Sequence, residues 1–204
     1  MEYKDILGLI AVVLAFACYI PIFWGIFFGT VKPHLYTYLV WSIITTLGFL
    51  ASWFSGGEAG SWSLGFSALF CIGVFFLSFR YGTKDVTRSD ALYTIAAVIT
   101  IIPWLLTKDP TLSIILAVLI EILSFFPTLR KTWNDPYSEP FSSWSLNTLK
   151  HGVSISALSS FSIATVLYPT VLVIMNALLA GEIILRRTQK KDSKLLGQIN
   201  MKKR

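Results

Sequence analysis

The chain has 204 residues, of which 54% are apolar and 14% are charged, and its formal net charge is +6. Soluble domains usually carry about 25% charged residues, and a mean hydropathy of +0.67 leaves too little polar surface to cover a water-soluble globule. The composition therefore excludes an ordinary soluble protein. It predicts an all-α integral membrane protein with no separate soluble domain.

Apolar stretches long enough to cross the hydrocarbon core, which takes about 20 residues, recur along the whole chain. We expect seven membrane-spanning helices, at about residues 6–30, 34–55, 60–80, 90–107, 110–131, 141–163 and 165–186. The first stretch is too long, and its N-terminal flank too acidic, for a secretory signal. The dipeptide Pro103-Trp104 predicts a kink in the fourth span, with an interfacial tryptophan. The break between spans six and seven rests on Ser159-Ser160 and on Pro169 just beyond it.

Lysine and arginine are distributed unevenly between the two sides of this predicted bundle. Of the 17 such residues, 14 lie in the loops after spans one, three and five or in the C-terminal tail, and only Lys4 and Lys108 lie on the other side. Because cytoplasmic loops are enriched in these residues, the pattern predicts an outside N-terminus and a cytoplasmic C-terminus. We expect the basic tail to bind anionic lipid heads and not nucleic acid, since no basic nucleic-acid-binding fold carries it.

Several residues recur at an offset of 106 or 107 positions, which indicates an internal repeat. The matched pairs include Pro21 with Pro127, Pro33 with Pro140, and Arg80 with Arg186. Spans one to three and five to seven are interpreted as two copies, and a single intervening span makes the copies parallel, a 3+1+3 arrangement. The predicted division is a first repeat at 1–83, a linker helix at 84–108, a second repeat at 109–188 and a basic cytoplasmic tail at 189–204. The four prolines are predicted hinges.

This arrangement, with a proline near the cytoplasmic end of spans one and five, resembles the SWEET sugar carriers and the wider PQ-loop proteins. The second copy is the closer match: FPTLRK at 126–131 is followed by SEPFSSW at 138–144. These stretches are similar to the family's proline, basic residues and Ser-x-Glu-Gly-x-Ser segment. The family's glutamine after each proline is replaced by Ile22 and Thr128. More narrowly, the chain resembles a bacterial branch of SWEET-like membrane proteins.

The resemblance implies a carrier fold and some of its site residues. In the family, aromatic residues on spans two and six and asparagines on spans three and seven line the sugar site. Trp41 and Asn176 match two of these roles, whereas Phe70 stands at the repeat-related position of span three. A charged pocket suits an amino acid or another zwitterion better than a plain sugar. The lack of an Asn-x-Ser/Thr sequon is compatible with the location we expect, a bacterial inner (plasma) membrane.

Ionisable and polar side chains lie at similar depth within the predicted spans of the second copy. Glu121, Lys150, His151 and Asn176 each fall near the middle of a span. Intramembrane charges cost about 2.5–3.5 kcal/mol on insertion scales, so they usually mark functional sites. Helical spacing adds two residues on span six and one on span two. The candidate substrate-binding or proton-relay residues are Glu121, Lys150, His151, Asn176, Asn147, Trp144 and Trp41.

Three functional hypotheses follow from these residues. The leading one is a transporter of a small polar solute, working by alternating access, in which Glu121 and His151 exchange a proton while Lys150 and Asn176 hold the solute. The second is a pH-sensitive receptor, since the Golgi retrieval receptors resemble the same fold. The third is a scaffold in which Glu121 and Lys150 form a structural ion pair. The sequence contains no metal-ligand motif, catalytic set or phosphate loop, so we expect no enzyme activity, no metal and no cofactor.

Overall fold

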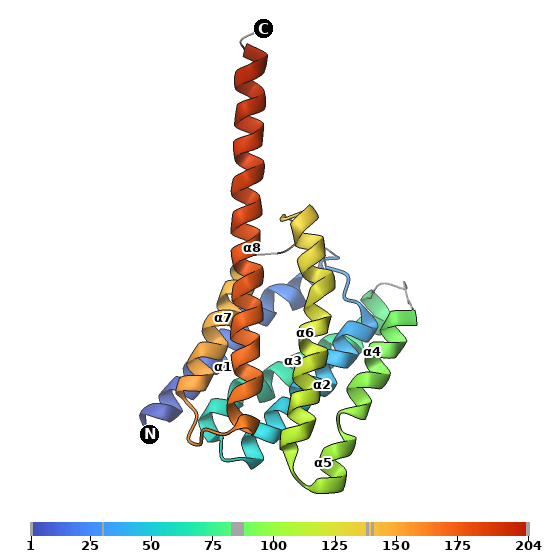
Figure 1. Ribbon diagram of the computed structural model, residues 1–204, viewed down its shortest axis with the longest axis vertical. Helices are drawn as coiled ribbons and strands as arrows, with labels where there is room; N and C mark the ends of the chain where they lie inside the picture. Colours follow the sequence, from blue (N-terminus) through green and yellow to red (C-terminus); the bar gives the residue numbers. More distant parts are fainter. Residues whose placement is uncertain (1, 30, 83–87, 138, 140, 203–204) are drawn as a thin grey trace.

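The chain folds into a bundle of helices (Figure 1), as the composition predicts. The computed structural model describes residues 2–29, 31–82, 88–137, 139 and 141–202; among these, residues 89, 90, 93, 126, 127, 130, 131 and 192–202 are described by their backbone alone. The structure is 86% helix, and no strand occurs in the described ranges. The helices are α1 (Tyr3–Phe27), α2 (Leu35–Phe54), the 3₁₀-helix η1 (Glu58–Ser61), α3 (Trp62–Tyr81), α4 (Arg88–Ile99), α5 (Ile102–Thr107), α6 (Pro110–Asn134), α7 (Phe141–Ser156) and α8 (Ile163–Lys202).

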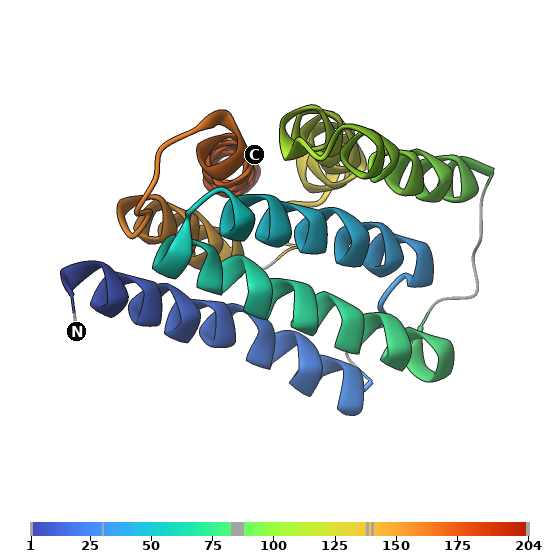
Figure 2. The ribbon, with the colours of Figure 1, turned by 90° about the horizontal axis from the view of Figure 1, so that it is seen from below.

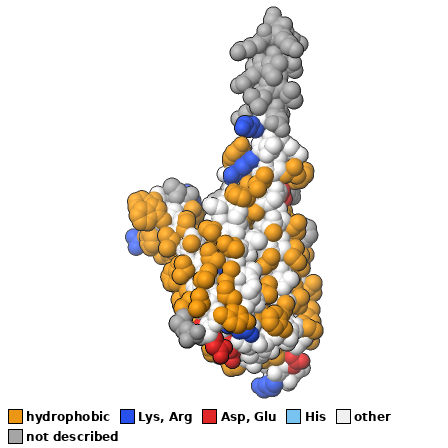
Figure 3. All heavy atoms as spheres, turned by 90° about the vertical axis from the view of Figure 1, so that its left-hand side faces the viewer, with side chains coloured by type: hydrophobic (Ala, Val, Ile, Leu, Met, Phe, Trp, Pro, Cys, Tyr) orange, Lys and Arg blue, Asp and Glu red, His pale blue; other side chains and the backbone are white. Residues whose placement is uncertain are grey.

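By length and composition, four helical segments of the described chain can cross a membrane. They are Tyr3–Phe27, Leu35–Phe54, Glu58–Tyr81 and Ile163–Lys191. Large apolar side chains on the outside of the bundle agree with a lipid environment: Phe76, Leu106 and Leu178 are each more than half exposed. Figure 3 shows hydrophobic side chains over most of one face, with charged side chains towards its ends. The predicted all-helical architecture is therefore confirmed, and the long apolar helices are compatible with an integral membrane protein.

Proline divides the predicted fourth span into two helices. α4 ends at Ile99 and α5 begins at Ile102, with Pro103 in its first turn. A proline ring clashes with the carbonyl four residues earlier and has no N–H to donate, so the helix cannot run through this point unbroken. The N–H of Trp104 instead donates to Ser113 Oγ of α6 at 3.0 Å. The predicted kink at Pro103-Trp104 is confirmed as a break.

The connection between α7 and α8 lies where the serines predict it. α7 ends at Ser156, seven residues before the end of the predicted sixth span, and α8 begins at Ile163. Ser162 and Thr165 form a reciprocal cap: the Thr165 N–H donates to Ser162 Oγ at 3.3 Å, and the Ser162 N–H donates to Thr165 Oγ1 at 2.9 Å. This satisfies N–H groups that a helix start leaves free. α8 then continues through Pro169 to Lys202, beyond the predicted seventh span.

Six helices form a closed ring around the middle of the bundle. Going round it, α1 packs on α3, α3 on α2, α2 on α6, α6 on α8, α8 on α7, and α7 on α1. Figure 2 shows α1, α3 and α2 as one row, with α7 and α8 beside one end of it. The helices α4 and α5 lie outside the ring, where α4 contacts α2 and α6, and α5 contacts α6. η1 contacts α1, α2, α3 and α7 and covers one end of the ring.

The main apolar core lies between α2, α6 and α8, on one side of the ring. Ile44, Ile114, Leu179 and Ile183 are fully buried there, together with the ring of Tyr168. A Cβ atom on Gly48 would lie 2.6 Å from the Tyr168 ring, so only glycine lets the ring pack this close to α2. This contact holds the Tyr168 hydroxyl at the inner surface of the ring of helices.

Candidate functional site

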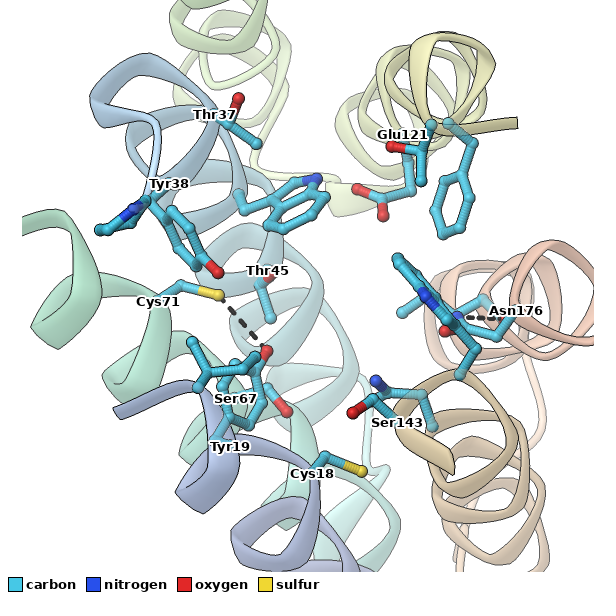
Figure 4. Close-up of a pocket in the computed structure, with 18 of the residues that line it drawn as sticks. Cys18, Tyr19, Thr37, Tyr38, Thr45, Ser67, Cys71, Glu121, Ser143 and Asn176 are labelled. Atoms are coloured by element: carbon cyan, nitrogen blue, oxygen red, sulfur yellow. Dashed lines mark hydrogen bonds between the residues drawn. The ribbon is translucent and has the colours of Figure 1, made fainter. Parts of the chain in front are cut away.

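A cavity of about 630 Å³ lies inside the ring of six helices (Figure 4). Its wall includes side chains from α1, α2, α3, α6, α7 and α8, so both predicted copies contribute. All seven candidate residues line it: Trp41 from α2, Glu121 from α6, Trp144, Asn147, Lys150 and His151 from α7, and Asn176 from α8. A cavity of this size falls in the range of small-molecule sites, about 300–1,000 Å³.

The cavity reaches one end of the bundle and is closed at the other. Lys32, Pro33 and His34, which precede α2, and Glu139, which precedes α7, lie along the wall at the first end. This is the end from which the C-terminal part of α8 projects (Figure 1). Of the four predicted hinges, Pro33 therefore lines the cavity, and Pro140 lies outside the described residues.

The opposite end of the cavity is sealed by η1 and its neighbours. Ser63 of α3 and Ser154 of α7 form a buried hydrogen bond across this end. Gly60 of η1 packs directly against Leu158, and a Cβ atom at Gly60 would lie only 2.6 Å from Leu158 Cδ2 and 2.7 Å from the Leu158 nitrogen. A glycine at this position permits the close packing that closes the cavity.

Lys150 places a basic group on the cavity wall. The residue is only 1% exposed, and its ammonium group donates a hydrogen bond to Ser67 Oγ of α3 at 3.0 Å. The ammonium nitrogen also lies 5.6 Å from the centre of the Tyr19 ring of α1, a cation–π contact. The neighbouring Tyr19 hydroxyl hydrogen-bonds Cys71 Sγ at 3.4 Å. The lysine of the second predicted copy is thus held by neutral groups of the first.

Glu121 places a carboxyl group on another part of the wall. It is 4% exposed, and its Oε2 accepts a hydrogen bond of 3.4 Å from the Tyr168 hydroxyl. That hydroxyl also lies 3.4 Å from Thr45 Oγ1 of α2. Figure 4 shows Glu121 across the cavity from the group of Tyr19, Ser67 and Cys71. Thr45, Tyr168 and Glu121 form one polar chain along the core side of the cavity.

Glu121 and Lys150 are a buried acid and a buried base that do not contact each other. Among the described residues, neither side chain forms an ion pair, and each is held only by hydroxyl groups and, for Lys150, by an aromatic ring. The structural ion pair of the scaffold hypothesis is therefore not formed in this structure. Burying a charge without an opposite partner is costly, so in their charged forms both groups would lack a compensating partner within this cavity.

Other candidate residues have unused hydrogen-bonding atoms. His151 is 3% exposed, and its Nδ1 has no hydrogen-bond partner among the described residues; the same holds for the indole nitrogen of Trp144. Asn176 donates from Nδ2 to the Leu172 carbonyl at 2.7 Å. The indole nitrogen of Trp41 donates to Ser124 Oγ at 3.5 Å. No hydrogen bond links Glu121 to His151 in the described part of the chain, so a proton exchange between them would need an intervening group.

The remaining two hinge candidates lie within helices. Pro21 is inside α1, which runs through it from Tyr3 to Phe27. Pro127 lies within α6, and its side chain is outside the described residues. Val31 donates from its N–H to the Gly25 carbonyl at 2.9 Å, so the chain turns back towards α2 soon after α1 ends.

Several cavity residues were missed from the sequence. Ser67 and Cys71, with Ser63 and Ser78, occupy one face of α3 at spacings of four and seven residues, the same kind of small polar stripe that marked other spans. This stripe could have identified Ser67 and Cys71 as cavity residues. Tyr19 and Tyr168 were missed because a tyrosine in an apolar span is equally typical of packing.

The basic residues at the junction of the second predicted repeat and the predicted tail bind the protein itself. Arg186 Nε donates to the Trp133 carbonyl at 2.9 Å, Lys190 Nζ donates to the Asn134 carbonyl at 2.8 Å, and Arg187 donates to the carbonyls of Pro136 and Glu139 at 2.9 and 3.0 Å. Cations at the C-terminus of a helix such as α6 are favourable for its free carbonyls and dipole. α8 thereby fixes the segment between α6 and α7 at the cavity's edge.

At the start of α6, Asp109 accepts a 2.8 Å hydrogen bond from the Thr111 N–H. Hydrogen bonding by Thr111 holds the pKa of this carboxyl below its ordinary value, as expected when the charged form accepts a hydrogen bond. Within the described residues, no three His, Cys, Asp or Glu side chains lie close enough together to hold a metal ion.

Comparison with protein-family models, with curated proteins and with solved structures found no match to this chain. The resemblance to SWEET and PQ-loop proteins therefore rests on the sequence pattern alone.

Proposed function

We propose that this chain is a membrane carrier or facilitator of a small zwitterionic solute, such as an amino acid, with Glu121 and Lys150 binding its opposite charges. The observation that carries the proposal is that one cavity contains a buried carboxyl group and a buried amino group without an ion pair between them. A solute with an ammonium and a carboxylate group would supply each with its missing partner. A sugar would offer only hydroxyl groups to both.

The contacts between helices support the proposed 3+1+3 arrangement. If α1, α2 and α3 are exchanged for α6, α7 and α8, the contacts α1–α3, α2–α3 and α2–α6 become α6–α8, α7–α8 and α7–α1, and all six contacts occur. Two parallel three-helix copies related by an axis along the membrane normal would produce this pattern. In this arrangement α4 and α5 form the linker, and α7 completes a span despite its short length. The N-terminus is outside.

The shape of the cavity supports alternating access. With the orientation predicted from the basic residues, the cavity reaches the cytoplasmic end and is sealed at the outer end by η1. The structure then corresponds to a cytoplasm-facing state. Transport would proceed by opening the seal between Gly60 and Leu158 while the segments at Pro33 and Glu139 close together. We place the protein in a bacterial inner membrane.

The decisive experiment combines solute binding with flux. Purified wild-type protein is screened by thermal shift with amino acids, sugars, nucleosides and vitamins at mildly acidic and neutral pH. The solute that stabilises it is then tested for uptake into proteoliposomes. We expect an amino acid to bind and to be transported, and Glu121→Gln and Lys150→Gln each to lose both properties. Glu2→Gln and Lys4→Gln make the same changes outside the cavity and serve as matched controls.

Three outcomes would contradict the proposal. A sugar that binds equally well to wild type and to both charge variants would remove the role given to the charges. Binding of a peptide or protein with no solute flux would favour the receptor hypothesis, with Glu121, Lys150 and His151 as its pH-sensitive groups. Binding that is absent for every solute, with variants that differ only in stability, would favour the scaffold hypothesis.

A further inference from the structure

A second hollow lies on the outside of the bundle, away from the proposed solute cavity. It is a groove of about 600 Å³ with α2 at its base and with α3 and the α4–α5 region beside it. Apart from the Trp104 indole, polar side chains along it are limited, among the described residues, to Ser42, Thr46 and Lys108. Ser42 already donates to the Tyr38 carbonyl at 2.6 Å. The groove is therefore almost entirely apolar.

The groove has the length of one membrane leaflet. It follows α2 from Leu39 to Leu50, a distance of about 16 Å at about 1.5 Å per residue. The hydrocarbon core of a bilayer is about 30 Å thick, so one leaflet contributes about 15 Å. An acyl chain lying along α2 would fit between the aromatic side chains of α3, such as Phe75 and Phe76, and Leu105 of α5.

The polar end of the groove carries a single charge. Lys108 follows α5, with its backbone fixed by a 2.8 Å hydrogen bond from its N–H to the Trp104 carbonyl. The Trp104 ring also contacts Phe54 at the end of α2, with 6.1 Å between ring centres, so this region lies beside the C-terminal end of α2. Within the part of the chain that the structure describes, the Lys108 ammonium makes no hydrogen bond or ion pair. The neighbouring carboxylate of Asp109 is turned towards Thr111.

We propose that this groove is a binding site for an anionic glycerophospholipid, with one acyl chain along α2 and the phosphate at Lys108. An apolar slot of leaflet length fits the chain, a tryptophan at its polar end is typical of the membrane interface, and the cation selects the headgroup charge. The site is independent of the solute cavity, because the two hollows have no lining residue in common. α5, which begins at the break near Pro103, contributes Trp104 and Leu105 to its wall.

Native mass spectrometry of the full-length protein tests this site. Delipidated protein is titrated with phosphatidylglycerol and, separately, with phosphatidylcholine of the same acyl chains. We expect wild type to retain one phosphatidylglycerol more strongly than phosphatidylcholine. Lys108→Gln should weaken phosphatidylglycerol binding about fivefold, which corresponds to the binding free energy that one cation contributes near an anionic lipid surface. It should leave phosphatidylcholine binding unchanged. Lys4→Gln removes a cation from α1, away from the groove, and should change neither lipid.

A second variant tests the groove itself. Thr46→Phe places a ring at the base of the groove and should reduce binding of both lipids. Val13→Phe adds a comparable ring to an exposed part of α1 and should have no effect. Equal retention of the two lipids by wild type, or an unchanged preference in Lys108→Gln, would overturn the proposal. A dimer that excludes lipid and is lost in Thr46→Phe would instead assign the groove to a second copy of the chain.

Discussion

Replacing Lys150 by methionine should remove solute binding without unfolding the protein. The substitution removes the hydrogen bond to Ser67, worth about 1.5–3 kcal/mol because the donor is charged, and the contact with the Tyr19 ring, worth about 1 kcal/mol. It also removes a buried charge whose insertion costs about 3 kcal/mol. Because these contributions nearly cancel, the free energy of unfolding should stay within about 1 kcal/mol of wild type.

The solute affinity should change much more than the stability. A charge-assisted hydrogen bond contributes about 1.5–3 kcal/mol, which corresponds to a loss of about 10- to 150-fold in affinity. Isothermal titration with the amino acid found by thermal shift would measure this loss. Glu121→Gln and the double variant complete a mutant cycle: if one solute bridges both charges, the two losses should not add.

Two results would refute this reasoning. Loss of one partner of a buried ion pair typically costs 3–5 kcal/mol, so a destabilisation of that size in Lys150→Met would mean that Lys150 and Glu121 pair with each other in the membrane. Unchanged solute affinity in Lys150→Met would mean that the solute binds elsewhere. A Lys191→Met control removes an exposed lysine from the C-terminal helix, outside the cavity, and should leave the affinity unaltered.

Three further predictions test the cavity's two ends and its wall. The first uses a background lacking Cys18 and Cys71. Ser143→Cys on the cavity wall should react with a membrane-impermeant maleimide from the α8-tail side only, whereas Ser63→Cys behind the closed end should not react from that side. Equal labelling of both variants would contradict a cavity that is open at one end. Gly60→Val should force Leu158 away, lower the melting temperature, and make Ser143→Cys reactive from the opposite side as well. Gly48→Ala should lower the free energy of unfolding by about 1–3 kcal/mol, because the added methyl group overpacks against the Tyr168 ring. Adding Tyr168→Leu should recover part of that loss. A Gly48→Ala variant as stable as wild type in thermal unfolding would show that the ring can move.

The break at Pro103 and the α7–α8 connection could both be found in the sequence, for different reasons. Pro103 acts through local sterics, which hold in any tertiary context. The Ser162–Thr165 cap likewise depends on residues three apart, and it would have placed the start of α8 more closely than the serine pair did. The end of α7 at Ser156 could not be predicted, because the residues after it remain apolar enough to continue a span. Packing of Leu158 against η1 decides that end.

The candidate site was accessible to sequence reasoning because charges are rare within apolar spans. Glu121 and Lys150 stood out by type and depth, and the structure places both on one cavity. Their lack of contact could not be predicted, since pairing depends on the rotation of α6 and α7 about their axes. The neutral partners were harder to identify: a serine such as Ser67 is common at helix packing seams, so its bond to Lys150 becomes visible only in three dimensions.

The two proposed copies contribute different chemistry to the cavity, and this suggests how binding and movement are coupled. Lys150 of the second copy is held by Ser67 of the first, and the polar chain from Glu121 passes through Tyr168 to Thr45 of the first copy. A rocking motion of one copy against the other would stretch both of these connections. A zwitterionic solute would replace the lost partners with stronger, charge-assisted ones, so the occupied carrier would cross between states more easily than the empty one. We therefore expect exchange of labelled for unlabelled solute to be faster than net uptake of solute into empty proteoliposomes. Equal rates would mean that solute binding does not affect the contacts that change during the rocking motion.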